Sequence, residues 1–477
     1  MRHAFGPGRS GRGDGRPRAM GVGWIKGFVL FALAILLAVP AALAAQPTKQ
    51  TLFNFDGSDG RDPASAIVAD PEGNLYSATT TGGLPCKTTP FSSPGCGVVL
   101  ELSPPADRAG AWRKRVLYRF TGGVDGAFPG ATLVRGGDGT LYGTTYIGGN
   151  GPIACLPPAT GCGTVFSLTP PVAAGATAWT LRTLYSFQYN GDGGNPLSLT
   201  AGPTPGTLVG AAEFTAYGIG QALGCGLPLG HNCGLVFQLT PPAVAGGAWT
   251  ETILHAFTGI PKGATTGDGE RPFSIVGDSR GGYVGATLYG GKRQFGSTYG
   301  ALFGLTPPAG GTGPWSETVV FSFPRLWGYQ NSDLAADREG NVFGNTDSAG
   351  YAVIYELTGG KVAPLRAGAH TPKTPRFYNG MTTDAAGNLY GVNGFSGTHG
   401  WGSVFELLRP ANAGAHWSSK LLYSFAGGPD GQDPTGALAL VGHTLFGTTR
   451  GGGSVTGRCV KGGLGCGTVF SLDPTNP

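Results

Sequence analysis

The feature that most constrains the fold of this chain is a short motif that recurs seven times. Its first copy reads GNLYSATT and begins at Gly73, and a second motif of the form GTVFSL follows each copy. Self-similarity in units of this length is the signature of a repeat architecture. The leading apolar residues of the seven copies are Leu75, Leu141, Leu208, Tyr283, Val342, Leu389 and Leu445.

Each unit holds four expected strands, which we letter A to D in chain order. Strand A precedes an Asp/Gly turn such as DPEGN, strand B is the LYGTT segment, strand C is the TVFSL segment, and strand D is a run such as WTLRTLYSF (179–187). These runs alternate apolar and polar residues and are rich in β-branched and aromatic types, which is typical of strands. Four-stranded units repeated seven times predict an all-β fold, a seven-bladed β-propeller.

The two ends of the repeat region predict that the propeller is a closed ring. The chain enters it with KQTLFNF (49–55), a D-type strand with no unit before it. It leaves with GTVFSLDP (467–474), a C-type strand with no D strand after it. The first strand can therefore complete the last blade, and closure protects the sheet edges. We expect the propeller to occupy residues 46–477; an open solenoid or two smaller sandwiches are the alternatives.

The repeated segments resemble the GloVer tandem repeat of exported bacterial proteins. The resemblance rests on segments such as GTLYGTT, GTVFSLTPP and LYSF. It covers nearly all of residues 49–474 and is most specific in units 1, 2 and 7. It implies a secreted, propeller-like protein, and it implies no established chemistry and no catalytic residues.

Residues 1–45 have the features of a secretory signal peptide. The apolar run GFVLFALAILLAVPAALAAQ follows Lys26 and ends in small residues, and a start at Met20 would give a cleaner signal. Of the 32 basic and 27 acidic residues, six and one lie in this leader, so the rest of the chain carries 26 of each. That balance argues against a nucleic-acid partner. The alternative is an uncleaved anchor, although the run is barely long enough to span a bilayer.

The eight cysteines form four local pairs, each in the loop between strands B and C of its own unit. An exported protein passes through an oxidising compartment, which favours disulfides. Zinc would need two pairs together or added histidines, and no Cys-x-x-Cys redox motif occurs. We therefore predict four structural disulfides: Cys86–Cys96, Cys155–Cys162, Cys225–Cys233 and Cys459–Cys466.

Five of the loops from strand D to the next strand A carry Asp-Gly-x-x-Pro. We expect these loops on the same face as the B-to-C loops. One interpretation is a ring of carboxylates that holds a cation such as calcium. We favour a turn that begins at Asp-Gly and is stiffened by Pro, because every blade needs a turn whereas a site needs few ligands. The aspartates are Asp59, Asp125, Asp192, Asp268 and Asp430. We expect no resident metal or other cofactor.

Units 4 to 6 depart from the pattern and give the candidate ligand-binding residues. All three lack the cysteines, and units 5 and 6 replace the Asp-Gly-x-x-Pro loops by PRLWGYQNS (324–332) and GAHTPKTPRFYNG (368–380). Aromatic rings with a few polar donors suit stacking on a sugar or holding a peptide. Divergence of the loops without function is the alternative. The candidates are Trp327, Tyr329, His370, Arg376, Tyr378, His399 and Trp401, with Lys373 beside them.

One catalytic motif is present by sequence and is rejected by its place in the repeat. GDSRG (277–281) matches the Gly-x-Ser-x-Gly nucleophile motif, but Ser279 falls in the expected A-to-B hairpin of unit 4. The motif needs a strand-to-helix turn, and no helix is expected there. We assign no catalytic residue.

These observations predict an exported, non-catalytic propeller that binds a polysaccharide or a surface protein. We expect it to be secreted, periplasmic or on the cell surface, to be monomeric, and to have no membrane span once the leader is removed. The main alternative is a propeller-fold polysaccharide lyase or hydrolase that uses His370, Arg376, Tyr378 or His399 on the loop face of units 4 to 6. A purely structural protein is the third possibility.

Overall fold

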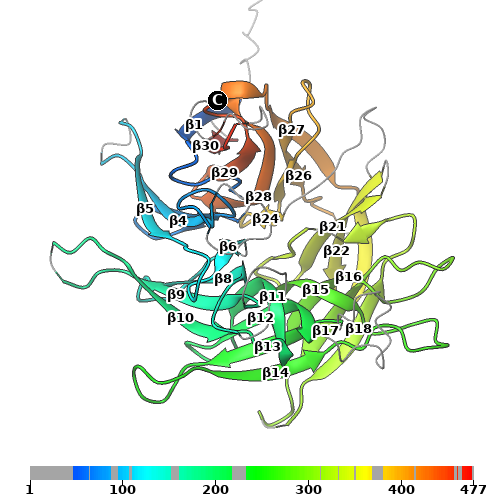
Figure 1. Ribbon diagram of the computed structural model, residues 1–477. Helices are drawn as coiled ribbons and strands as arrows, with labels where there is room; N and C mark the ends of the chain where they lie inside the picture. Colours follow the sequence, from blue (N-terminus) through cyan, green and yellow to red (C-terminus); the bar gives the residue numbers. More distant parts are fainter. Residues whose placement is uncertain are drawn as a thin grey trace, which may run out of the picture. The chain divides into compact units, whose positions relative to one another are not determined.

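The computed structural model is an all-β propeller of seven antiparallel blades (Figure 1). Within each blade the strands lie in chain order from A to D. The A strands of neighbouring blades contact one another around the ring, so strand A is the innermost. The structure describes residues 47–63, 65–86, 95–106, 110–130, 132–151, 161–173, 175–216, 233–311, 313–330, 332–348, 351–367, 380–412, 415–455, 459 and 465–474.

The first four blades contain the strands up to residue 322. Blade 1 holds β2 (Val68–Ala69), β3 (Leu75–Thr79), β4 (Val98–Ser103) and β5 (Arg113–Arg119). Blade 2 holds β6 (Ala127–Pro129), β7 (Val134–Arg135), β8 (Leu141–Ile147), β9 (Thr164–Thr169) and β10 (Thr180–Ser186). Blade 3 holds β11 (Asn190–Ala201), β12 (Leu208–Ala216), β13 (Leu235–Thr240) and β14 (Thr250–Ala256). Blade 4 holds β15 (Glu270–Gly277), β16 (Tyr283–Tyr289), β17 (Ala301–Thr306) and β18 (Ser316–Ser322).

The last three blades contain the remaining strands, including the N-terminal one. Blade 5 holds β19 (Tyr329–Gln330), β20 (Ala335–Ala336), β21 (Val342–Ser348), β22 (Tyr351–Thr358) and β23 (Lys361–Ala367). Blade 6 holds β24 (Thr382–Thr383), β25 (Leu389–Asn393), β26 (Ser403–Leu408) and β27 (Ser418–Ser424). Blade 7 holds β28 (Gln432–Val441), β29 (Thr444–Gly451), β30 (Thr468–Asp473) and β1 (Thr48–Asn54).

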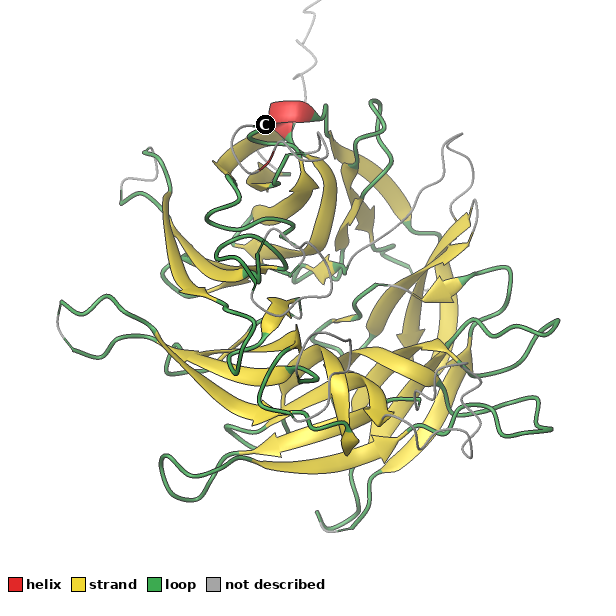
Figure 2. Cartoon of the chain, viewed as in Figure 1, coloured by secondary structure: helices red, strands yellow, loops and turns green. Residues whose placement is uncertain are grey.

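The predicted closure of the ring is confirmed. Strand β1 pairs antiparallel with β30, from Thr48 opposite Asp473 to Asn54 opposite Thr468. The chain therefore supplies the outermost strand of blade 7 first and its other three strands last. Strands and loops make up nearly all of the described chain (Figure 2), and the one helix that is described over its full length is the short 3-10 turn Gly428–Asp430. No helix in the described residues is long and apolar enough to cross a membrane.

The glycine of the LYG motif is explained by packing inside the blade. A Cβ on Gly143 of strand B would lie 2.6 Å from Cζ of Phe166 on strand C, so only glycine leaves room for the ring. Blade 1 has Ser77 at this position and the smaller Leu100 opposite it, which keeps the volume balanced. The same close fit occurs in the pairs Gly210–Phe237, Gly285–Phe303, Gly344–Tyr355, Gly391–Phe405 and Gly447–Phe470.

Consecutive blades are joined by aromatic contacts in the core. In five of the blades the Phe that follows strand D is almost fully buried and packs against the strand C aromatic residue of the following blade. Phe120 and Phe166, for example, meet edge to face with their ring centroids 5.3 Å apart. Such pairs add stability beyond the apolar area that they bury. The other pairs are Phe187–Phe237, Phe257–Phe303, Phe323–Tyr355 and Phe425–Phe470.

The five Asp-Gly-x-x-Pro loops also bind the blades that they enter to the preceding blade. Asn195, the residue before Pro196, has a positive φ of 55° and donates its N–H to the carbonyl of Cys162 in the preceding blade at 2.7 Å. The proline ring packs on Gly163, whose Cβ would come within 2.6 Å of Pro196 Cδ. The left-handed backbone is unfavourable for a residue before proline, so the surrounding contacts must hold it. The equivalent residues Asp62, Phe128, Arg271 and Asp433 also have positive φ.

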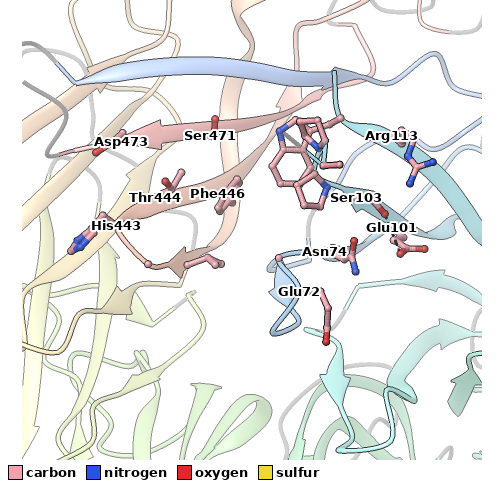
Figure 3. Close-up of a pocket in the computed structure, with 17 residues that line it drawn as sticks. Glu72, Asn74, Glu101, Ser103, Arg113, His443, Thr444, Phe446, Ser471 and Asp473 are labelled. Atoms are coloured by element: carbon pink, nitrogen blue, oxygen red, sulfur yellow. Dashed lines mark hydrogen bonds between the residues drawn. The ribbon is translucent and has the colours of Figure 1, made fainter. Parts of the chain in front are cut away.

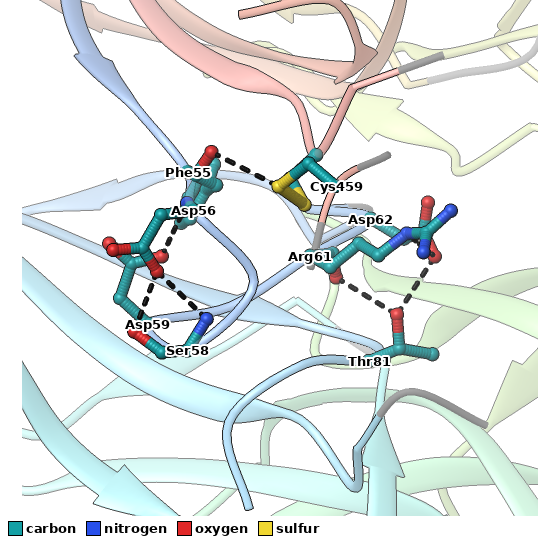
Figure 4. The surroundings of a disulfide bond; sticks show 9 residues. Phe55, Asp56, Ser58, Asp59, Arg61, Asp62, Thr81 and Cys459 are labelled. Atoms are coloured by element: carbon teal, nitrogen blue, oxygen red, sulfur yellow. Dashed lines mark hydrogen bonds and ion pairs between the residues drawn. A yellow bond between two sulfur atoms is a disulfide. The ribbon is translucent and has the colours of Figure 1, made fainter. Parts of the chain in front are cut away.

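The disulfides lie at these blade seams. Cys86–Cys96 and Cys459–Cys466 are bonded as predicted, with Cα–Cα distances of 4.9 and 5.2 Å. Cys459 lies against the loop that leads into blade 1, with its sulfur 3.6 Å from the carbonyl of Phe55 (Figure 4). Cys162 and Cys233 are also disulfide-bonded. Their predicted partners, Cys155 and Cys225, lie outside the described residues.

Candidate functional site

The propeller presents two different faces. The D-to-A and B-to-C loops share one face, as predicted. Hydrogen bonds join each of three D-to-A loops to the B-to-C loop of the blade that it enters: Gly83 N–H to Gly57 O, Gly149 N–H to Gly123 O, and Gly453 N–H to Gly428 O. We call this the disulfide face. The A-to-B hairpins and C-to-D loops form the opposite face, which we call the hairpin face. Each carries one feature of interest.

A groove opens on the hairpin face at the seam between blades 7 and 1 (Figure 3). Its volume is about 970 Å³, which is in the range of small-molecule sites. Blade 7 contributes His443, Thr444, Phe446, Ser471 and Asp473, and blade 1 contributes Glu72, Asn74, Glu101, Ser103, Trp112 and Arg113.

The groove exists partly because blade 7 has a short A-to-B hairpin. In blade 7, Val441 pairs with Thr444, and only Gly442 and His443 form the turn. In blade 1 the last pair is Ala69 with Leu75, which leaves the five residues 70–74 for a larger turn. The shorter hairpin leaves the space above the seam unfilled.

One other seam shows how an arginine can fill the same space. At the seam between blades 5 and 6, Arg409 reaches back from its C-to-D loop to Asp337 at 3.3 Å and Glu356 at 3.0 Å. Its guanidinium lies 5.8 Å from the ring centroid of Trp417, whose indole it covers. At the seam between blades 7 and 1 the residue at the Arg409 position is Pro104, and Trp112 takes the place of Trp417. Trp112 lines the groove, and among the residues that the structure describes no arginine lies over its indole.

The lining combines an aromatic floor with mixed hydrogen-bonding walls. Trp112 is half-buried and contacts Phe446 edge to face, with centroids 5.6 Å apart, so its indole is held rigidly. Glu72 and Arg113 are exposed, and Asn74 and Glu101 are half-buried on the same side (Figure 3). Carboxylates accept, guanidinium donates, and amide and hydroxyl groups do both. Such a lining can hold a ligand that has an apolar face and many hydroxyl groups.

The structure divides the sequence-predicted site residues among three places. Trp327 packs between Phe321 of blade 4 and Tyr355 of blade 5, so most of its ring belongs to the core. Tyr329 is 36% exposed and contacts Tyr289 and Tyr299 at the seam between blades 4 and 5.

The remaining candidates lie near blade 6 or outside the described chain. Trp401 is 45% exposed, and its backbone carbonyl accepts the N–H of Asp433, a role that the second cysteine plays in blades 1 to 3. His399 is exposed in the same B-to-C loop. His370, Lys373, Arg376 and Tyr378 lie outside the described residues.

The recurrent aspartates act in their own turns. Asp125 accepts the N–H of Thr121 at 2.8 Å and of Gly123 at 3.2 Å, which closes the D-to-A loop. In all five turns the carboxylate accepts the N–H of the residue after the terminal Phe of strand D. The turn interpretation accounts for these carboxylates. Among the described residues no group of three or more His, Cys, Asp or Glu side chains could hold a metal ion.

A strand D position six residues before the terminal Phe differs between blades in its charge. In blade 7 it is Lys49, whose Nζ donates to Asp430 Oδ1 at 2.7 Å, and in blade 1 it is Lys114, which pairs with Asp59. In blade 3 the same position is Glu251, which lies close to Asp192. Burial, with a smaller contribution from Asp192, raises the pKa of Glu251 to about 7.

Blade 4 repeats this arrangement with Glu317. Burial raises its pKa to about 7, although His255 partly offsets the effect, and the carboxylate of Asp268 adds to it. Asp268 itself lies 3.2 Å from His255 Nε2. In the described chain the Oε1 atoms of Glu251 and Glu317 are buried without a hydrogen-bond partner. Blades 3 and 4 therefore have two neighbouring carboxyl groups at this position, whereas blades 7 and 1 have a lysine–aspartate ion pair there.

Ser279 lies where the repeat predicted it. It falls in the turn between β15 and β16, and Asp278 holds this turn by accepting the N–H groups of Arg280 and Gly282. Its hydroxyl is next to Gly340 of the neighbouring hairpin. Strand β16 follows the turn, so Ser279 does not occupy the strand-to-helix turn that the Gly-x-Ser-x-Gly motif requires.

The groove was not among the sites predicted from the sequence. Its signal was nevertheless present in the aligned repeats, as the two-residue hairpin turn at Gly442 and His443. Proline at the Arg409 position occurs in five of the seven units, so Pro104 does not distinguish this seam. The filled seam between blades 5 and 6 shows which side chains can occupy the space.

Comparison with known proteins finds similar solved structures at low sequence identity. No family model and no curated protein matches the sequence. Similar solved structures include the PQQ-bound aldose sugar dehydrogenase from Streptomyces coelicolor, with 12% identity and a TM-score of 0.40 over 90% of this chain and 98% of that one. A putative 6-phosphogluconolactonase from Bacteroides fragilis has 13% identity and a TM-score of 0.44 over 79% and 88% of the two chains. The resemblance to the GloVer repeat remains a prediction.

Proposed function

We propose that this protein is an exported, non-catalytic propeller that binds a polysaccharide chain in the groove between blades 7 and 1. The observation that carries the proposal is an open groove of about 970 Å³ with an indole on its floor and polar groups on both walls. A sugar ring has an apolar face that packs on an aromatic ring, and its hydroxyl groups exchange hydrogen bonds with carboxylates, amides and hydroxyls.

Export is supported by two independent features of the chain. The first 45 residues have the pattern of a signal peptide. Disulfides at the blade seams persist in oxidising compartments and are rare in the cytosol. Both features suit a protein that meets its ligand outside the cytoplasm.

The proposal is tested by filling the groove with the arrangement found between blades 5 and 6. Pro104→Arg combined with Ser471→Glu places the equivalents of Arg409 and Glu356 over Trp112. A glycan array on the native protein first identifies a ligand. We expect the double variant to lose at least about tenfold in affinity for that ligand, because the arginine would occupy the space of the sugar.

The control makes the same change at another seam. Pro241 holds the Pro104 position in blade 3, so Pro241→Arg adds an arginine there and should leave glycan affinity unchanged. Unchanged affinity in the Pro104→Arg/Ser471→Glu variant would remove the groove as the binding site.

Turnover distinguishes binding from the enzymatic alternative. The lyase or hydrolase interpretation uses the disulfide face, at His399 and at residues that the structure does not describe. Any glycan that binds is incubated with the protein and assayed for new reducing or unsaturated ends. Their appearance would replace the binding role by an enzymatic one.

A further inference from the structure

Three loops on the disulfide face of blades 4 and 5 are tied into one platform. They are residues 258–267, 290–300 and 324–328. Arg293 N–H donates to Thr265 O at 2.8 Å, which joins the first loop to the second. Gln294 joins the second to the third, because its Nε2 donates to Phe323 O at 3.0 Å and its Oε1 accepts the N–H of Arg325 at 3.1 Å. We call these three loops the basic platform.

The basic platform has charge of one sign. It carries four exposed cations and no Asp or Glu in any of its three segments. In the part of the chain that the structure describes, no ion pair joins any of the four to a carboxylate. The adjacent Asp268 is occupied by the N–H groups of Thr258 and Gly259. The cations are Lys262, Lys292, Arg293 and Arg325.

Two large apolar side chains project from the same loops. Phe295 is 90% exposed and Leu326 is 82% exposed, more than any other apolar residue described on this face. Arg325 lies 5.6 Å from the centroid of the Phe295 ring, so the two tips belong to one patch. Exposed apolar groups within a rim of charge mark an interaction surface.

Folding does not explain the choice of phenylalanine at position 295. Ser297 N–H donates to Gln294 O at 3.0 Å, and both central residues of this turn, Phe295 and Gly296, have positive φ (50° and 85°). Turns with two positive φ values strongly favour Asn or Gly at the first central position, and a bulky residue is strained there. Phe295 is therefore unfavourable for folding in two ways, because its ring is exposed to water and its backbone is strained. This points to a role outside the fold.

We propose that the basic platform docks the protein onto an anionic lipid surface, with Phe295 and Leu326 inserted among the lipids and the four cations at the headgroups. An apolar anchor together with a basic cluster is the combination that gives peripheral membrane binding. A shallow depression of about 350 Å³, lined by Lys262 and Arg293, can receive a headgroup phosphate beside the two tips.

The exposed leucine distinguishes a lipid partner from an acidic polysaccharide. Both would satisfy the cations, but a glycan has no apolar interior to accept Leu326, whereas a bilayer does. Docking through the disulfide face would leave the groove on the hairpin face directed away from the membrane. The lipid proposal is independent of the proposed function, since the groove and the platform share no residue.

The test measures sedimentation of the purified protein with vesicles of phosphatidylcholine, with and without phosphatidylglycerol. We expect binding only when phosphatidylglycerol is present. Phe295→Asn should weaken it roughly tenfold or more, the loss expected when one large apolar side chain no longer inserts. Lys292→Gln should weaken it roughly fivefold. The melting temperature of Phe295→Asn should be equal to or above that of the native protein, because Asn suits this turn.

Two variants complete the design. Val124→Asn removes an exposed apolar side chain elsewhere on the same face and should bind vesicles normally. The groove variant Pro104→Arg/Ser471→Glu should also bind vesicles normally, so failure of one proposal does not mask the other. Equal vesicle binding by Phe295→Asn and the native protein would overturn the proposal. So would binding to a soluble acidic polysaccharide, lost in Lys292→Gln, without any binding to vesicles.

Discussion

Replacing Glu251 by glutamine should stabilise the protein at alkaline pH and leave its stability unchanged at acid pH. Glu251 of blade 3 lies next to Asp192. The equivalent strand D position is a lysine in blades 7 and 1. Its Oε1 is buried and has no hydrogen-bond partner among the described residues. The folded protein therefore holds this carboxyl group more easily in its neutral form.

The magnitude follows from the pKa of about 7, against an ordinary value of 4.5. Below about pH 4.5 the group is protonated in both states and costs nothing. As pH rises from 4.5 to 7 the unfolded chain releases the proton first, so stability falls, and above 7 the full penalty applies. The shift corresponds to at most about 3.4 kcal/mol, and partial exposure to water reduces it to about 1.5 to 2 kcal/mol.

Calorimetric melting at pH 4 and pH 8 measures the effect. For a propeller of this size a gain of 2 kcal/mol raises the melting temperature by about 2 °C, and Glu251→Gln/Glu317→Gln should give about twice that at pH 8. Glu251→Lys should stabilise at least as much at pH 8, since it can form the pair seen at Lys114. Glu339→Gln, at an exposed hairpin position, is the control and should change nothing. An equal gain at both pH values would refute the reasoning.

Three further predictions concern the packing of the repeat. Gly163→Ala, where φ is +103° and a Cβ would meet Pro196 Cδ at 2.6 Å, should cost about 2 to 3 kcal/mol in guanidinium unfolding. Gly143→Ser should cost a similar amount alone and less when combined with Phe166→Leu, the pair that blade 1 uses; a double-mutant cycle that shows simple additivity would contradict the packing argument. Cys459→Ser/Cys466→Ser should lower the free energy of unfolding by about 2 to 3 kcal/mol, because it releases a short loop, and an unchanged unfolding midpoint would contradict this.

Most of the fold could be predicted from the sequence, because the same pattern of strands and turns recurs in seven units. The strand period, the Asp/Gly turns and the unpaired terminal strands together imply a closed ring of seven blades. The ring is closed by the pairing of β1 with β30. The pairing of Cys86 with Cys96 and of Cys459 with Cys466 followed from their place in the unit. Local sequence determines these features because each unit folds by nearest-neighbour contacts.

The candidate site could not be predicted in the same way. Residue type favoured Trp327 and Trp401, yet Trp327 is largely buried against Phe321 and Tyr355, and the backbone of Trp401 latches blade 6 to blade 7. Chemical character alone does not say whether an aromatic ring faces solvent or the core. The groove instead depends on what is missing at one seam.

The sequence by itself determined the number of blades, the closure of the ring, the turns and the positions of the cysteines. The tertiary structure alone decided which seams are filled. Whether Arg409 covers one tryptophan while Trp112 lines an open groove depends on residues of two different blades. The repeat pattern specifies each blade separately, whereas a binding surface arises from differences between neighbours that meet only when the ring has formed.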